Sequence, residues 1–215
     1  MPGNFSRVLQ EDPGRILARL WGRLRAWQLS MQSNVTLEGT VHILGAPLID
    51  IRKGSNLTLG NGVILTSRNK GYHLNIPAPV KFFADRPGAE IRIGDDTRIA
   101  GSCIHAQNSV VIGKRCLIAG NCQIIDSNGH DLSFPNVERR VRSEGSSYPI
   151  VIEDDVWIGA GSIVLPGVRI GKGSVIVANS VVSASVPPMV VARGNPATVV
   201  LDYRAESGNL SGSEP

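Results

Sequence analysis

Four histidines are the side chains of this chain best suited to proton transfer, because imidazole titrates close to neutral pH. They are His42, His73, His105 and His130. His130 differs from the others because it opens a long stretch without periodicity directly after a periodic segment, and it follows Asp126 as D-x3-H. An isolated loop histidine is more often a solvated bystander than a base. The meaning of His130 therefore depends on the elements and motifs around it.

The three cysteines are the other reactive side chains. Cys103, Cys116 and Cys122 do not form the even, regularly spaced set that indicates a disulfide framework. All three stand at the small-residue position of a repeat unit. We therefore interpret them as reduced thiols that serve as small apolar corner residues.

The elements that would position His130 repeat every six residues. The period is carried by six consecutive aliphatic residues, Ile152, Ile158, Val164, Ile170, Ile176 and Val182. Small or β-branched residues follow four positions after most of them, at Val156, Ser162, Val168, Ser174 and Ser180. A period of six fits neither an amphipathic helix nor a half-buried strand, and it predicts an all-β fold, the hexapeptide β-helix. Three hexapeptides make one coil, so Ile152 should stack on Ile170, and Ile158 on Ile176.

The same period runs upstream with interruptions, through Leu37, Ile43, Leu59, Leu65, Ile93, Ile99, Ile112, Ile118 and Ile124. Gaps of 28 residues follow both Leu65 and Ile124. They predict two extruded loops, at about 66–90 and 126–149. The first loop would contain Phe82 and Phe83. The second loop would carry His130 near its start. Loops on a rigid scaffold carry function more often than the regular coils do.

Composition agrees with one solenoid domain and two tails. The chain has 215 residues, of which 42% are hydrophobic and only 5% aromatic, as suits a thin core built from Ile, Val and Leu. We expect an N-terminal segment at 1–33, the β-helix domain at 34–201 and a flexible tail at 202–215. No apolar run approaches the ~18 residues of a membrane span, and the N-terminus lacks the apolar stretch of a secretory signal, so we expect a cytoplasmic location.

Residues 14–32 predict a basic amphipathic helix. Its apolar positions are Ile16, Leu20, Leu24, Trp27 and Met31, and its charges are Arg15, Arg19, Arg23 and Arg25. Two interpretations stay open. The helix could pack on the end of the solenoid or on a neighbouring subunit, or it could make a peripheral contact with the inner face of a membrane. The net charge of +4 comes partly from this segment and, without a nucleic-acid motif, predicts no nucleic-acid binding.

The chain resembles hexapeptide-repeat O-acetyltransferases in two segments, IGKRCLIAGNCQIIDSNGHDLS (112–133) and PIVIEDDVWIGAGSIVLPGVRIGKGSVIVANSVVSASVPPMVVARGNPATVV (149–200). The specific motifs are D-x3-H (126–130), V-W-I-G-A-G (156–161) and G-N-P-A (194–197). The likeness is to bacterial sugar and polysaccharide acetyltransferases of the maltose and galactoside acetyltransferase group. It covers 91–201 well and 34–65 loosely. The resemblance implies a left-handed parallel β-helix, a homotrimer, and active sites in the clefts between subunits.

The resemblance also implies the roles of individual residues. His130 matches the general base of a direct transfer from acetyl-CoA to a sugar hydroxyl, with no acyl-enzyme. Asp126, or alternatively Asp131, would orient its imidazole. The backbone N–H of Ala160 matches the oxyanion donor, and Trp157 would wall the thioester site. The groove that holds the pantetheine arm matches Gly159, Ala160, Ala178 and Ser183.

The sequence departs from the galactoside enzymes at three positions. Ala184 and Thr198 stand where basic residues would meet the phosphates of CoA, so Lys172 or Arg193 would have to replace them. Gly101 stands where those enzymes carry an asparagine that binds the acceptor. This difference argues against a galactoside as the acceptor.

We therefore expect transfer of an acetyl group to a sugar hydroxyl of a cell-surface polysaccharide or its lipid-linked precursor. The alternatives are an acetyltransferase acting on an amino sugar or an antibiotic, and a non-catalytic scaffold with the same solenoid. A zinc-dependent lyase of the gamma carbonic anhydrase type would need two histidines as H-x4-H. The histidines of this chain have no such spacing, so we expect no metal.

Overall fold

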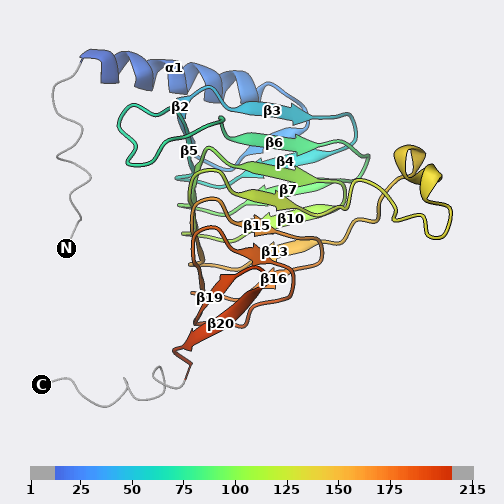
Figure 1. The fold of residues 1–215 in the computed structure, drawn as a ribbon. Coiled ribbons are helices and arrows are strands. Elements are labelled where there is room, and N and C mark those ends of the chain that lie inside the picture. The colour runs from blue at the N-terminus through green and yellow to red at the C-terminus, as the bar shows by residue number, and fades with distance from the viewer. Residues whose placement is uncertain (1–12, 205–215) are drawn as a thin grey trace, which may run out of the picture.

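The computed structural model describes the backbone of residues 13–204 and the side chains from Leu17 onward, except that of Arg19. Most of this chain winds into a prism with three flat sides, each of them a sheet of stacked parallel strands (Figure 1). One turn of the chain places one short strand on each side in succession. This is the parallel β-helix that the six-residue period predicts, and it is consistent with the left-handed winding that the family resemblance implies.

We name the sides A, B and C and the edges between them the AB, BC and CA corners. Side A contains β1 (Val35–Leu37), β4 (Asn56–Leu59), β7 (Glu90–Ile93), β10 (Ser109–Ile112), β13 (Ile150–Ile152) and β16 (Arg169–Ile170). Side B contains β2 (His42–Gly45), β5 (Ile64–Ser67), β8 (Arg98–Ala100), β11 (Leu117–Ile118), β14 (Trp157–Ile158), β17 (Val175–Ile176), β19 (Val190–Gly194) and β20 (Ala197–Asp202). Side C contains β3 (Leu48–Ile51), β6 (Lys81–Ala84), β9 (Cys103–Ala106), β12 (Gln123–Ile125), β15 (Ile163–Val164) and β18 (Val181–Val182).

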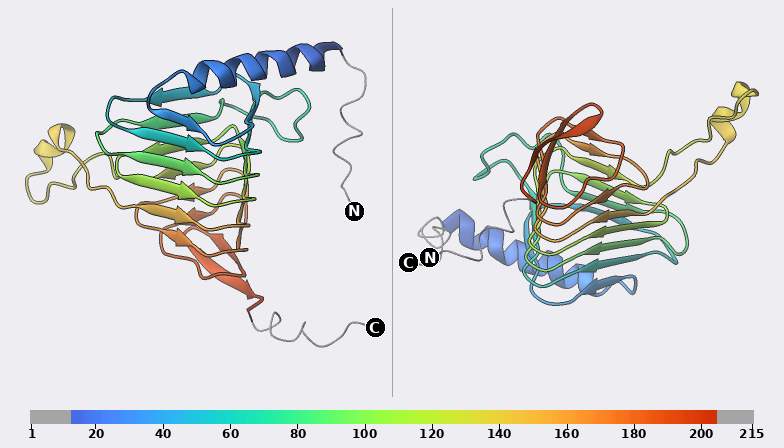
Figure 2. Two further views of the ribbon diagram at one scale, coloured as in Figure 1. Left: turned by 180° about the vertical axis from the view of Figure 1, so that it is seen from behind. Right: turned by 90° about the horizontal axis from the view of Figure 1, so that it is seen from below.

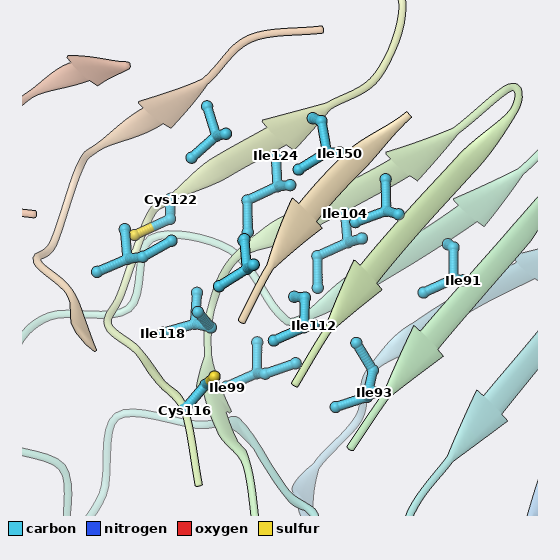
Figure 3. Packing of buried hydrophobic residues seen from close by; sticks show 14 of the residues in the cluster. Ile91, Ile93, Ile99, Ile104, Ile112, Cys116, Ile118, Cys122, Ile124 and Ile150 are labelled. Carbon is cyan, nitrogen blue, oxygen red and sulfur yellow. The ribbon is translucent and has the colours of Figure 1, made fainter. Parts of the chain in front are cut away.

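The register of the strands confirms the predicted phase. Ile152 pairs with Ile170 on side A, and Ile158 pairs with Ile176 on side B. All six aliphatic residues of the regular run are fully buried, because each points into the prism while its strand neighbour points out. Figure 3 shows the core that results, with isoleucines of successive coils packed inside the prism.

Small polar residues at the corners hydrogen-bond one coil to the next. The Thr97 hydroxyl donates to the Gly113 carbonyl at 2.7 Å, and the Ser102 hydroxyl donates to the Ala119 carbonyl at 2.7 Å. Cys116 and Cys122 occupy equivalent buried positions, and burial raises the pKa of the Cys116 thiol to about 11. The prediction for Cys103 was wrong: the buried corner position belongs to Ser102, and Cys103 lies on the partly exposed outer face of β9.

The first loop is shorter than the predicted 66–90. β6 lies inside that range and takes its place on side C between β3 and β9. Phe82 is fully buried there and pairs with Ile49 and Ile104, so an aromatic ring fills a position that the aliphatic pattern could not reveal. Only the segment between Ser67 and Lys81 leaves the BC corner. The second loop leaves the CA corner between β12 and β13, as predicted for 126–149, and contains the short 3-10 helix η2 (Val137–Arg142).

Both ends of the prism are covered. The helix α1 (Pro13–Ser30) lies across the first coil and packs on β2, which is the packing alternative for the predicted helix at 14–32. β19 and β20 form an antiparallel hairpin at the other end. The predicted tail at 202–215 begins too early, because Asp202 still belongs to β20; residues 205–215, and residues 1–12 of the N-terminal segment, lie outside the described residues. Within the described part, no helix is long and apolar enough to cross a membrane.

Candidate active site

His130 directly follows the last paired residue of a two-stranded stem in the second loop. Figure 1 shows this loop projecting from the prism next to β13. The stem is antiparallel. Ser127 pairs with Ser147, the amide of Asn128 donates to the carbonyl of Ser146 at 3.1 Å, and the amide of Gly145 donates to the carbonyl of Gly129 at 3.1 Å. Backbone pairing of this kind holds a projecting segment in one conformation, so His130 has a defined place although it is exposed.

Gly145 allows the two strands of the stem to meet at His130. A Cβ atom at Gly145 would lie 2.7 Å from the amide nitrogen of His130 and 2.8 Å from that of Gly129. Real Cβ atoms do not approach backbone atoms this closely. The stem therefore needs a glycine opposite the histidine.

The imidazole of His130 is oriented by a backbone carbonyl. Its Nδ1 lies 3.1 Å from the carbonyl oxygen of Ser143. A carbonyl only accepts hydrogen bonds, so this contact places a proton on Nδ1, and in the neutral imidazole Nε2 then keeps a free lone pair. Ser143 is itself fixed, because its hydroxyl accepts from the Asp131 amide at 2.9 Å and donates to the Arg140 carbonyl at 2.9 Å. The geometry presents Nε2 as a proton acceptor toward solvent.

Asp126 does not make the orienting contact expected of it. Its two carboxylate oxygens accept hydrogen bonds from the amides of Gln107 and Asn108, at 2.8 and 2.7 Å, and the side chain is fully buried. No described hydrogen bond joins it to His130. The alternative, Asp131, accepts from the Ser133 amide at 2.6 Å instead. The Asp126 carboxylate binds two backbone amides at the root of the loop and not the imidazole. Every residue has a backbone carbonyl, so the sequence gives no sign that the carbonyl of Ser143 is the one that orients His130.

The candidate oxyanion donor lies at the BC corner. The Gly159 amide donates to the Ile176 carbonyl at 2.8 Å and the Gly161 amide donates to the Gly120 carbonyl at 2.9 Å. Between them, the Ala160 amide has no acceptor among the described hydrogen bonds and is available to a ligand. The corner is tight, because a Cβ on Gly159 would lie 2.4 Å from the amide nitrogen of Ala178.

Other predicted donor-site residues surround this corner. Trp157 lies on the outer face of side B and is 51% exposed, two residues before Gly159. Ala178 occupies the same corner one coil further on, where its neighbour Asn179 donates its amide to the Ala160 carbonyl at 2.8 Å. Arg193 is the last residue but one of β19 and is exposed at the same edge of side B. The structure thus groups Trp157, Gly159, Ala160, Ala178 and Arg193 along one corner.

The first loop folds over the BC corner. Ile76, which is buried, contacts Gly101 so closely that a Cβ on Gly101 would lie 2.3 Å from the Ile76 Cγ2. The side chain of Asn69 fixes the loop by donating to the Ile76 carbonyl at 3.2 Å. Gly101 matches the position at which the resemblance places an acceptor-binding asparagine in galactoside enzymes, and in this chain Ile76 of the first loop packs against that position. The sequence could not reveal the close contact between Ile76 and Gly101, because the two residues are 25 positions apart.

Two predicted residues lie at other corners. Ser183 follows β18 at the CA corner, the corner that also carries the second loop. Lys172 follows β16 at the AB corner, where its amide donates to the Glu153 carboxylate at 2.7 Å. The AB corner is a ladder of charged turns, with Lys114 paired to Asp95 at 2.8 Å. Lys172 is therefore not brought next to the other predicted residues, and Arg193 remains the candidate for a phosphate contact.

The two halves of the predicted site lie at different corners of one chain. His130 projects from the CA corner, whereas Ala160 and Trp157 lie at the BC corner, across side C. Figure 2 shows the second loop extending away from the prism on the side opposite the first loop. A single chain does not bring His130 and the Ala160 amide together. In the described residues no group of three or more His, Cys, Asp or Glu side chains could hold a metal ion.

Comparison with known proteins gives the family. Residues 149–184 match the family model "Bacterial transferase hexapeptide (six repeats)". The chain is 35% identical over 163 residues to WbbJ of Escherichia coli K12, a protein provisionally assigned as a lipopolysaccharide biosynthesis O-acetyl transferase, with 73% of this chain and 74% of WbbJ covered. The chain is also 42% identical over 120 residues to YJL218W of Saccharomyces cerevisiae, a provisionally assigned acetyltransferase. The aligned region covers 55% of this chain and 59% of YJL218W.

A solved structure supports the same conclusion. The hexapeptide-repeat acetyltransferase VCA0836 of Vibrio cholerae O1 biovar eltor, crystallised with acetyl-CoA, superposes with a TM-score of 0.51 at 35% identity, covering 66% of this chain and 71% of that one. The likeness to WbbJ extends well beyond the repeats that the family model matches. On these grounds the chain belongs to the CoA-dependent acetyltransferases of the hexapeptide-repeat family.

Proposed function

We propose that this protein transfers an acetyl group from acetyl-CoA to a sugar hydroxyl of a cell-surface polysaccharide or its lipid-linked precursor. The observation that carries the proposal is the free Nε2 of His130, presented by a rigid stem. The likeness to WbbJ supports a glycan acceptor, and the acetyl-CoA complex of VCA0836 supports the donor. The reaction would take place in the cytoplasm, where acetyl-CoA is made and used.

His130 is the general base of the proposed reaction. An alcohol is a weak nucleophile at neutral pH, and Nε2 takes the hydroxyl proton as the oxygen attacks the thioester carbonyl. The new C–O bond leaves a negative oxygen, which receives a hydrogen bond from the Ala160 amide. The C–S bond then breaks, and the proton held by His130 passes to the departing sulfur. The enzyme returns to its starting state without an acyl intermediate.

The active site is proposed to lie between two copies of the chain. The CA corner of one copy would bring His130 and Ser183 to the BC corner of the next, which carries Trp157, Ala160 and Arg193. Contact between two different corners is a heterologous interface, and such an interface forms a ring when the rotation between neighbouring copies closes. A ring of three, the expected homotrimer, would contain three sites, and each copy would contribute its CA corner to one site and its BC corner to another.

The base is tested by His130→Ala. We expect kcat for acetyl transfer to fall by ~10²-fold or more, as on loss of a general base, with unchanged CoA binding in a melting-shift assay. His130 is exposed and its side chain makes no core contact, so folding should be unaffected. Activity within threefold of wild type contradicts the assignment.

The shared site is tested by mixing two inactive variants. Ala160→Pro removes the amide hydrogen, and a one-to-one mixture of this variant with His130→Ala should regain about a quarter of the wild-type activity, because each site draws its two halves independently. A mixture no more active than its parents would show that base and donor act within one chain. If Ala160→Pro does not fold, Trp157→Ala replaces it as the partner variant.

A further inference from the structure

The helix α1 has two apolar faces, and only one of them is used by the fold. The face that packs on the prism carries small residues, Ala18, Gly22 and Ala26, together with Leu29. A Cβ on Gly22 would lie 2.3 Å from the carbonyl oxygen of Ile43 in β2. The backbone of the helix therefore sits directly on the first coil at Gly22, and this contact fixes which face points outward.

The outward face carries the large apolar residues of the helix. We call it the α1 stripe, which consists of Leu17, Leu20, Trp21, Leu24, Trp27 and Met31. These side chains are between 42% and 69% exposed. Their spacing of three, four and seven residues places them on one side of a helix. Soluble proteins rarely expose a continuous apolar surface of this kind unless it binds something.

Arginines lie on both sides of the α1 stripe. Arg23 and Arg25 are separated by about 160° around the helix and fall on its two flanks, at about 100° per residue. The helix, PGRILARLWGRLRAWQLS, contains no acidic residue. An apolar stripe flanked by basic residues and containing tryptophan is the pattern of helices that lie in the interface of a bilayer.

A groove beside the stripe adds a cation from the prism. It is lined by Ala18, Trp21, Arg25, Gly45, Ala46 and Arg68. Arg68 follows β5, and its Nε is buried without a hydrogen-bond acceptor among the described residues. Two arginines, Arg25 from α1 and Arg68 from the prism, thus line one groove. Guanidinium binds phosphate with paired hydrogen bonds, so the groove fits a phosphate headgroup.

We propose that the α1 stripe docks this protein on the surface of an anionic phospholipid bilayer, with Trp21 and Trp27 at the interface and Arg23, Arg25 and Arg68 on the phosphates. Figures 1 and 2 show that α1 caps the prism and extends beyond it at one end, so a flat surface can reach the outward face. A second copy fits less well, because stripe against stripe would bring the arginines of two helices together. Three copies in one ring would strengthen the attachment by multivalency.

The docking surface is separate from the proposed site of acetyl transfer, since none of its residues lies at His130 or along Trp157 to Ala178. Docking on a membrane nevertheless affects which acceptors the protein meets. A protein held on the membrane meets lipid-linked glycans in two dimensions, whereas a free sugar gains nothing from this attachment.

The test is sedimentation of the full chain with vesicles at low salt. Wild-type protein should sediment with vesicles of equal parts phosphatidylglycerol and phosphatidylcholine, and much less with phosphatidylcholine alone. Arg23→Gln with Arg25→Gln should weaken the partition coefficient roughly 25-fold, about fivefold for each cation near such a surface. Leu24→Gln with Trp27→Gln should weaken binding at low and high salt alike, because it removes buried apolar area.

Two control pairs make the result specific. Arg92→Gln with Arg169→Gln removes the same charge from exposed positions elsewhere, and Val199→Gln with Val200→Gln removes exposed apolar residues from β20. Both should bind vesicles like wild type. Wild-type protein that ignores anionic vesicles, or an equal loss in the controls, overturns the proposal. A change in oligomeric size with unchanged vesicle binding assigns the stripe to another copy of the chain. Vesicle binding is measured without any acetyl-transfer assay. The proposed membrane docking and the proposed acetyl transfer can therefore fail independently of each other.

Discussion

At the scale of single residues, the candidate site of this protein is formed by backbone atoms as much as by side chains. The imidazole of His130 takes its tautomer from the Ser143 carbonyl, and the candidate oxyanion donor is the amide of Ala160. Neither partner contributes a side-chain group. Their positions depend on how closely two pieces of backbone approach, and Gly145 is the residue that permits this approach at the histidine.

Gly145→Ala should therefore damage catalysis without unfolding the protein. The new methyl group would have to push the backbone of His130 aside by several tenths of an ångström or more, and misplacement of a catalytic group on this scale can cost ~10²-fold in rate. We expect kcat to fall at least tenfold while the melting temperature changes little, since the stem lies outside the core.

Gly88→Ala is the matched control. Gly88 lies in a turn with a φ of 86°, and nothing lies within 4 Å of an added Cβ. This variant strains the backbone by about 1 kcal/mol and should leave kcat unchanged. If both variants have wild-type activity, the close approach at Gly145 does not position the histidine.

At the scale of elements, the strands from β14 to β18 are only two residues long, and one of their two side chains points outward while the other points into the core. In β16, Arg169 points outward and pairs with Glu153, whereas Ile170 is fully buried. Strands this short cannot be stable alone. They persist because each is bonded to the strand above and the strand below, and because the inward residue belongs to a continuous column of aliphatics.

Ile170→Asp should prevent soluble folding. It places a carboxylate without a partner in the core, at a cost of several kcal/mol, against the roughly 5–15 kcal/mol that separates folded from unfolded proteins. Arg169→Asn, on the same strand, changes only an exposed ion pair and should cost about 1 kcal/mol or less. Soluble expression and the melting temperature measure both. Equal melting temperatures for wild type and Ile170→Asp would refute the phase of the coil.

At the scale of the whole molecule, the protein is a stack of coils in which each coil contacts only its neighbours, so the two ends need cover. The β19–β20 hairpin covers one end and α1 covers the other. The small residues of α1 let the helix backbone rest on β2, and its large residues are left for the outside. One helix thus closes the solenoid and carries the α1 stripe.

Gly22→Leu should lower the melting temperature, because a side chain at this position cannot fit against the Ile43 carbonyl and must lift the helix from the first coil. Lifting it exposes Leu29 and Ile43, which are buried in the native state. Gln28→Leu adds the same side chain at an exposed position of the helix and should leave the melting temperature unchanged. Thermal unfolding of the two variants tests whether α1 is a cap.

The sequence by itself determined the solenoid, because a six-residue period has one structural meaning: Ile152 to Val182 were placed in the core and paired correctly. It also located the second loop and the family motifs around His130 and Trp157. Local spacing cannot reveal contacts between residues far apart in the chain. For that reason only the tertiary structure decided that Phe82 belongs to a coil, that Asp126 bonds two amides instead of the imidazole, and that Ile76 covers Gly101. It alone also set His130 and Ala160 at different corners, since a corner exists only where successive hexapeptides close into one three-sided coil and not within any single hexapeptide.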